Sequence, residues 1–167
     1  METITKTNVQ NVSLHKEVDA IVTEYHNYFR NNLPGISTIL SSCIKIDKAV
    51  APQLDIIYKH FVEFKVLLEQ HISKEKFILF PVIEKLSLDG ELSFIVNDFK
   101  KIYQKIWNDI NRLSSILMKI KTLTNNYKPA ANASQSLKQC YMDLNLLEQN
   151  CKRYFEIEKK YLKPILN

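Results

Sequence analysis

Apolar residues recur along most of the chain at alternating intervals of three and four positions, which is the spacing of one face of an α-helix. The strict alternation of apolar and polar residues that marks a half-buried strand is missing. Four such runs occur, and each would turn one stripe toward a shared core. The stripes consist of Val22, His26, Phe29, Leu33, Ile36, Leu40 and Cys43; of Ile57, Phe61, Phe64, Leu68, His71, Glu75 and Ile78; of Leu92, Ile95, Phe99, Ile102, Ile106, Ile110, Leu113, Leu117 and Ile120; and of Leu137, Cys140, Leu144, Leu147, Cys151, Tyr154, Glu158, Tyr161 and Ile165.

Breaks between the runs are short and few. Residues 47–52 separate the first run from the second, with Pro52 suited to a first helical turn. Asp89 and Gly90 supply the next stop, and residues 124–129 end the third run. Asn132 with Gln135 is expected to cap the fourth helix.

Four long helices with short connections predict an all-α, up-down-up-down four-helix bundle. Pro34 and Gly35 interrupt the first run, but the apolar spacing continues beyond them, so we expect a kink rather than an end. Residues 1–12 are polar and are expected to form a flexible segment. The bundle is therefore predicted to span residues 13–167.

Composition and charge exclude several classes of protein. The net charge is +5, but lysines are interleaved with acidic residues and form no run of five, which argues against a nucleic-acid partner. No stretch approaches the roughly 18 apolar residues of a membrane span, and the N-terminal residues lack a signal-peptide pattern. We therefore expect a cytoplasmic protein whose three cysteines, Cys43, Cys140 and Cys151, are reduced and mostly buried.

Five polar residues lie within the predicted apolar stripes: His26, His71, Glu75, Tyr154 and Glu158. A buried carboxylate without a partner costs several kcal/mol, so two of them beside two histidines need a common explanation. The pairs His71/Glu75 and Tyr154/Glu158 are each four residues apart and lie on one helix face. Imidazole and carboxylate groups suit iron, manganese or zinc, so we interpret the cluster as a metal site.

The alternative interpretation is that each residue is an ordinary buried polar group with a hydrogen-bond partner, since most buried polar groups have one. Glu158 is near the C-terminal end of the sequence and can also reach water. His15 and His60 lie off the stripes and are interpreted as surface residues. Both interpretations stay open at this point.

Four segments resemble the hemerythrin-like, HHE cation-binding domain of the repair-of-iron-centres family. The similarity spans about residues 20–166. It is carried by residues 21–26 with Arg30, Leu33 and Pro34; by residues 67–75 followed by 78–81; by residues 123–127 with Pro129; and by Leu147, Glu148, Glu158, Leu162 and Pro164.

The resemblance implies a hemerythrin-like fold and a non-haem di-iron site with four histidines and two bridging glutamates. It also implies a role in repairing iron–sulfur clusters damaged by nitric oxide or oxidants. His26, His71, Glu75 and Glu158 match ligand positions of the family. Ile110, preceded by Asp109, and Tyr154 stand where the family has its other two histidines. The family's separate N-terminal module with paired cysteines is not expected here.

These two departures leave the occupancy of the site open. His26, His71, Glu75, Glu158 and Tyr154 are the predicted metal-binding residues, holding two iron ions weakly, one ion, or none, with zinc or manganese as alternatives to iron. We expect an iron donor or sensor in the response to nitrosative and oxidative stress rather than a turnover enzyme. Its expected partner is an iron–sulfur protein or another regulatory protein. The competing hypothesis is a metal-free bundle that acts as an interaction or regulatory protein.

Overall fold

The computed structural model describes the backbone of residue 16, residues 18–89 and residues 92–162, without the side chains of 85–89, 92–98, 161 and 162. The predictions for residues 1–12, Gly90, Leu92, Ile95, Tyr161, Ile165 and His15 therefore lie outside what is described. Within this part of the chain every regular element is a helix. The elements are η1 (Ile21–His26), α2 (Asn27–Ile46), α3 (Leu54–Lys74), η2 (Glu75–Leu79), α4 (Phe80–Asp89), α5 (Leu92–Leu123) and α6 (Gln135–Leu162).

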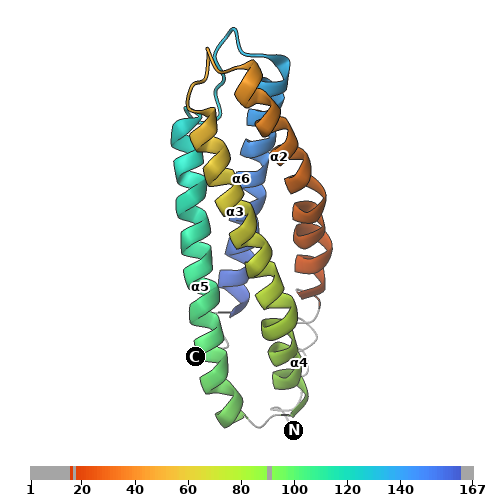
Figure 1. Cartoon of the computed structure of the whole chain (residues 1–167). Coiled ribbons are helices and arrows are strands. Elements are labelled where there is room, and N and C mark those ends of the chain that lie inside the picture. Colours follow the sequence, from red (N-terminus) through yellow and green to blue (C-terminus); the bar gives the residue numbers. More distant parts are fainter. Residues whose placement is uncertain (1–15, 17, 90–91, 163–167) are drawn as a thin grey trace.

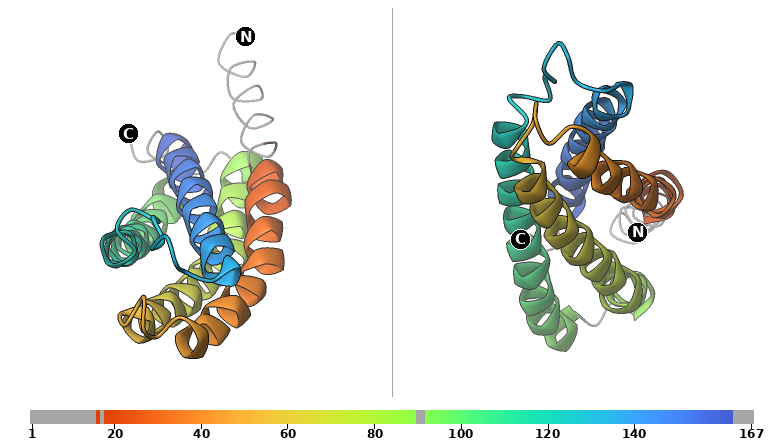
Figure 2. Two further views of the ribbon diagram at one scale, coloured as in Figure 1. Left: turned by 90° about the horizontal axis from the view of Figure 1, so that it is seen from above. Right: turned by 45° about the horizontal axis from the view of Figure 1, so that its top comes forward.

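These elements form four antiparallel rods, because η1 continues into α2 and α3 continues through η2 into α4 (Figure 1). Around the bundle α2 contacts α3, α3 contacts α5, α5 contacts α6, and α6 returns to α2. The view from above shows this ring of four rods (Figure 2). The prediction of an all-α, up-down-up-down bundle is confirmed.

The helix ends follow the predicted breaks, with one correction. The connections 47–53 and 124–134 lie at the same end of the bundle, at the top of Figure 1. The cap of α6 is Ser134 rather than Asn132 with Gln135, because the Leu137 N–H donates to Ser134 Oγ at 3.1 Å. The buried Asp47 carboxylate holds Ser134 in place by accepting bonds from its N–H at 2.7 Å and its hydroxyl at 2.6 Å.

Pro34 and Gly35 lie inside α2, which continues past them as expected. Three consecutive residues after α5 have positive φ, namely Asn125, Asn126 and Tyr127. Asparagine tolerates this left-handed conformation better than most residues, so the loop reverses the chain tightly there. The Thr124 hydroxyl accepts a bond from the Tyr127 N–H and thereby holds the turn together.

Most of the predicted stripe residues that are described are buried, Ile102 is partly buried, and two are exposed. Val22 is 37% exposed while Ile21 is 5% exposed, and Ile78 is 46% exposed while Leu79 is 1% exposed. Both errors fall in the π-helical segments η1 and η2. A π turn holds more residues than an α turn, so the buried face moves along the chain by one position.

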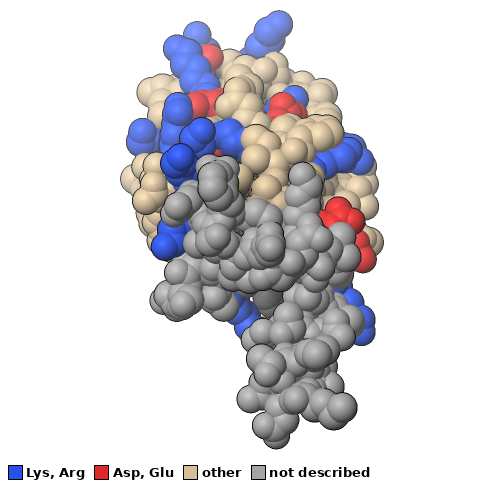
Figure 3. Space-filling model, turned by 90° about the horizontal axis from the view of Figure 1, so that it is seen from below, with Lys and Arg blue, Asp and Glu red and all other residues tan. Residues whose placement is uncertain are grey.

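The surface and the cysteines agree with the remaining predictions that the described residues test. Lys and Arg occur on both sides of the molecule in the view from below, with Asp and Glu among them (Figure 3). All three cysteines are free and buried. None of the helices in the described residues has the length and hydropathy needed to cross a membrane.

Candidate metal centre

Two π turns bring polar residues into the lower half of the bundle as drawn in Figure 1. The Asn27 N–H donates to the carbonyl of Val22, and the Phe80 N–H donates to the carbonyl of Glu75, each five residues back. His26 is the last residue of η1 and Glu75 the first of η2. Short π segments inside α-helices are frequently found at functional sites, and here each one carries a candidate ligand.

All five predicted site residues converge. His71, Glu75 and Glu158 each offer one ligand atom, and these three atoms lie within 4.8 Å of one another. His71 Nε2 is 3.2 Å from Glu158 Oε1, and His26 Nε2 is 2.8 Å from Glu75 Oε2. Tyr154 donates a short hydrogen bond from its hydroxyl to Glu75 Oε2. Their role as metal ligands stays a prediction.

The hydrogen bonds divide the cluster into two sides. On one side, Glu75 Oε2 accepts from Tyr154 and lies beside His26, whose Nε2 is also 3.4 Å from the Tyr154 hydroxyl. On the other side are His71 and Glu158. Glu75 Oε1 and Glu158 Oε1 are buried and make no hydrogen bond to any residue that the structure describes. Buried carboxylate oxygens without a donor are rare, and a cation would satisfy both.

Aromatic rings exclude water from the cluster. Tyr154 packs against Tyr25 at 5.6 Å and Phe29 at 5.5 Å between ring centroids. Phe80 stacks on His26 at 6.0 Å, and Phe155 meets the edge of His71 at 6.3 Å. In these surroundings each charged form is poorly solvated, so any charge in the cluster depends on a nearby partner.

This burial changes the acidity of the cluster. Loss of water, followed by the charge of Glu158, raises the pKa of Glu75 to about 7, against a lowering by His26. Burial is also the main cause that raises the pKa of Glu158 to about 8. The Tyr154 phenol has its pKa raised well above 10 by burial and by the two carboxylates. Protons therefore compete with a cation for these oxygens near neutral pH.

Asp109 lies beside the cluster, although the sequence interpretation treated it only as the neighbour of Ile110. Ile110 is buried and offers no donor atom. Asp109 Oδ2 lies 3.7 Å from His71 Nδ1 and 2.6 Å from Lys74 Nζ. The sequence feature that could have indicated this contact is helical position, because Asp109 borders the apolar stripe of α5 and Lys74 follows His71 by one turn.

Comparisons with known proteins place this architecture in a family. Residues 18–166 match the model of the hemerythrin HHE cation binding domain. The chain belongs to this family. Membership of the HHE family indicates that the domain binds a cation, as the buried histidine and carboxylate cluster suggests independently.

Relatives of this HHE domain include three proteins with related names. It is 30% identical over 158 residues to the "Probable iron-sulfur cluster repair protein" of Haemophilus influenzae, covering 90% of this chain and 64% of that protein. It is 26% identical over 155 residues to "Iron-sulfur cluster repair protein YtfE" of an Enterobacter species, covering 92% and 66%. Identity to "Iron-sulfur cluster repair protein ScdA" of Staphylococcus haemolyticus is 22% over 155 residues, covering 93% and 68%. The chain thus spans about two thirds of the length of these relatives.

Proposed function

We propose that this chain binds iron at His71, Glu75 and Glu158 and supplies or senses iron in the repair of iron–sulfur clusters. The observation that carries the proposal is the convergence of three buried ligand atoms within 4.8 Å, with Glu75 Oε1 and Glu158 Oε1 left without hydrogen-bond donors. Two carboxylates and an imidazole suit a first-row divalent ion. A cation there would also offset the cost of burying two acids side by side.

One ion fits these contacts better than two. Glu75 uses Oε2 for His26 and Tyr154, which leaves Oε1 for an ion shared with His71 and Glu158. A second ion beside His26 and Tyr154 would first have to displace their bonds to Glu75. Its ligands would be one imidazole, a phenol with a raised pKa and a shared carboxylate, so we expect it to be held more weakly.

The identity of the ion and the role in repair rest on the relatives. Their names describe iron–sulfur cluster repair, and this chain aligns with them over nine tenths of its length. We therefore favour iron over zinc or manganese, an iron–sulfur protein as the partner, and the cytoplasm as the location. A site with carboxylate ligands and few imidazoles would hold iron loosely, which suits donation of iron or sensing of stress better than turnover of a substrate.

Elemental analysis of protein purified without chelator, followed by anaerobic titration with ferrous iron, tests this proposal. We expect about one ion per chain, and Glu158→Gln should bind at least tenfold more weakly because a ligand charge is lost. Glu148→Gln is the matched control, since Glu148 is also a buried glutamate of α6 but pairs with Lys121 and Lys152. Iron-loaded protein should then restore activity to an iron–sulfur enzyme treated with nitric oxide.

A metal-free interaction protein is the second candidate. It is favoured by Ile110, which offers no ligand atom, and by Tyr154, whose hydroxyl already pairs with Glu75. In that case Glu158→Gln would leave the melting temperature nearly unchanged with or without chelator. Wild-type protein that contains no metal and takes up none would favour this candidate over iron binding.

A further inference from the structure

The two ring nitrogens of His71 have different surroundings. Nε2 faces the carboxylate of Glu158 inside the cluster, at 3.2 Å from Oε1. Nδ1 is directed away from it toward α5, where Asp109 Oδ2 lies at 3.7 Å. The ring is fully buried, and Nδ1 makes no hydrogen bond to the described residues. A buried ring N–H without an acceptor is costly, and Asp109 Oδ2 is the carboxylate oxygen placed to accept it.

Asp109 is fixed in place from the other direction. The Lys74 ammonium lies 2.6 Å from the same oxygen, Oδ2, that faces His71. Asp109 is therefore held beside the candidate ligand His71 by its ion pair with Lys74.

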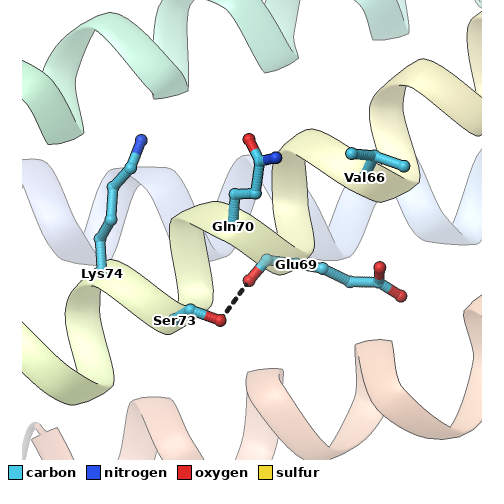
Figure 4. Close-up of a pocket in the computed structure, with 5 residues that line it drawn as sticks. All are labelled: Val66, Glu69, Gln70, Ser73 and Lys74. Carbon is cyan, nitrogen blue, oxygen red and sulfur yellow. Dashed lines mark hydrogen bonds between the residues drawn. The ribbon is translucent and has the colours of Figure 1, made fainter.

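Lys74 connects this pair to solvent. Its side chain is 35% exposed and lines a shallow groove with Val66, Glu69, Gln70 and Ser73. In Figure 4, Lys74 and Gln70 extend from α3 toward α5, whereas Ser73 bonds back to the backbone of Glu69. A continuous line of polar groups thus runs from the groove through Lys74 and Asp109 to the buried imidazole.

We propose that Asp109 is a positioning residue that accepts the Nδ1–H of His71 and aims Nε2 at the bound ion, with Lys74 holding Asp109. This inference rests on the proposed iron site. Metal-binding histidines usually donate their other ring N–H to a carboxylate or carbonyl, which fixes the tautomer and increases the basicity of the ligand nitrogen. The 3.7 Å separation needs to shorten by only about 0.8 Å to reach a charge-assisted hydrogen bond.

The pair predicts an asymmetric centre. His71 has a carboxylate on the far side of its ring, whereas the His26 ring contacts Glu75 and Tyr154 inside the cluster. His71 is then the stronger imidazole ligand of the two. This is consistent with an ion on the His71 side of Glu75.

Anaerobic titration with ferrous iron of wild type, Asp109→Ala, Asp109→Glu and Lys74→Met tests the role of Asp109. Asp109→Ala should lower iron affinity by about 10–100-fold, the usual cost of losing such a partner. Asp109→Glu should restore most of it, and Lys74→Met should give an intermediate loss. Asp109→Asn keeps the side-chain volume and replaces Asp109→Ala if the latter does not fold.

Glu63→Ala is the matched control, because Glu63 of α3 pairs with Arg112 of α5 at 2.9 Å and so links the same two helices. It should leave iron affinity unchanged. In a His71→Ala background, Asp109→Ala should have no further effect, whereas a purely structural role would weaken binding again. Nitrogen NMR of the metal-free protein should show the His71 Nδ1 proton signal in wild type and its shift in Asp109→Ala but not in Glu63→Ala.

The outcomes separate the two proposals. Wild-type protein that takes up no iron overturns the proposed function and this inference with it. Wild type that binds iron, with Asp109→Ala equal to Glu63→Ala in affinity and in the His71 nitrogen signals, overturns the role of Asp109 alone.

Discussion

The two halves of the bundle are built from the same helices but filled with different chemistry. Toward the connections 47–53 and 124–134 the core is mostly aliphatic and aromatic, with Leu40, Ile57 and Phe61 fully buried, and its buried carboxylates Asp47 and Glu148 have Ser134 and two lysines as partners. Toward η1 and η2 the core holds two histidines, two glutamates and a tyrosine. Regular α-helix accompanies the first half, and π turns accompany the second. The two halves thus differ in whether their buried carboxylates have donors, since Glu75 Oε1 and Glu158 Oε1 accept no hydrogen bond from the described residues.

The largest expected effect is in the apolar half. Phe61→Ala should lower the free energy of unfolding by about 3–5 kcal/mol, because it removes a fully buried ring and leaves a cavity. Iron should not change this loss, since Phe61 is not among the cluster residues. Urea unfolding with chelator and with excess ferrous iron measures both values. A loss below 1 kcal/mol would mean that the apolar half does not carry the stability.

The position of the buried face in η2 gives the next test. Leu79→Ala should cost about 2–5 kcal/mol, whereas Ile78→Ala should change stability by no more than about 0.5 kcal/mol, because only Leu79 is in the core. Thermal unfolding of the two variants in chelator compares them directly. The reverse order would mean that Ile78 rather than Leu79 lies in the core, as a regular α-helix without a π turn would place it.

Placing histidine at positions 110 and 154, where the resembled family has it, would make the polar half less stable without metal and a stronger metal binder. Ile110→His combined with Tyr154→His should lower the stability of metal-free protein by about 2–4 kcal/mol, since a buried aliphatic group and a hydrogen-bond donor are lost. The same variant should bind one more ferrous ion than wild type, because each imidazole adds a nitrogen ligand for the metal. Counting bound iron after anaerobic titration tests this. A folded variant with unchanged stoichiometry would contradict the assignment of these positions.

The pH dependence of stability tests the half that contains Glu75 and Glu158. The raised pKa values of Glu75 (about 7) and Glu158 (about 8) mean that folded, metal-free protein holds protons that the unfolded chain has lost above pH 4.5. Its free energy of unfolding should therefore fall as the pH rises from about 4.5 to 8, by up to about 1.4 kcal/mol per pH unit for each proton. Iron affinity should rise over the upper part of the same range, because the ion replaces these protons.

Chemical unfolding at pH 5, 6, 7 and 8 in chelator measures the slope. Glu158→Gln, which cannot lose a proton, should flatten it, while Glu148→Gln should not. A slope of the opposite sign in wild type would mean that both carboxyls are already charged in the folded protein.

Sequence spacing predicted the fold because the apolar half follows it without exception. Leu33, Ile36, Leu40 and Cys43 are all buried where a regular α-helix places them. The errors at Val22 and Ile78 have one cause, since a π turn depends on which carbonyl each N–H reaches in the packed bundle and leaves no mark in residue type. The spacing that located His71 and Glu75 is therefore less reliable immediately beyond them.

The site residues were predictable by type, but their connections were not. A histidine or a carboxylate in an apolar stripe predicts a buried polar site in any sequence, and Glu75 and Glu158 are such residues. The contact of Asp109 with His71 was not predicted, because an aspartate next to an apolar stripe is common on helix surfaces. Only the packing of α3 against α5 brings it to His71 and Lys74.

The π turn at Glu75–Leu79 also has a consequence for how this chain tolerates changes of length. Removing a residue from a regular helix rotates everything beyond it by about 100°, which would turn Ile83 out of the core. A π turn carries a surplus residue, so loss of one residue there converts it to an α turn and leaves the following helix facing inward. The segment is then a place where evolution can shorten the helix without unfolding the bundle, while moving Glu75 relative to His26.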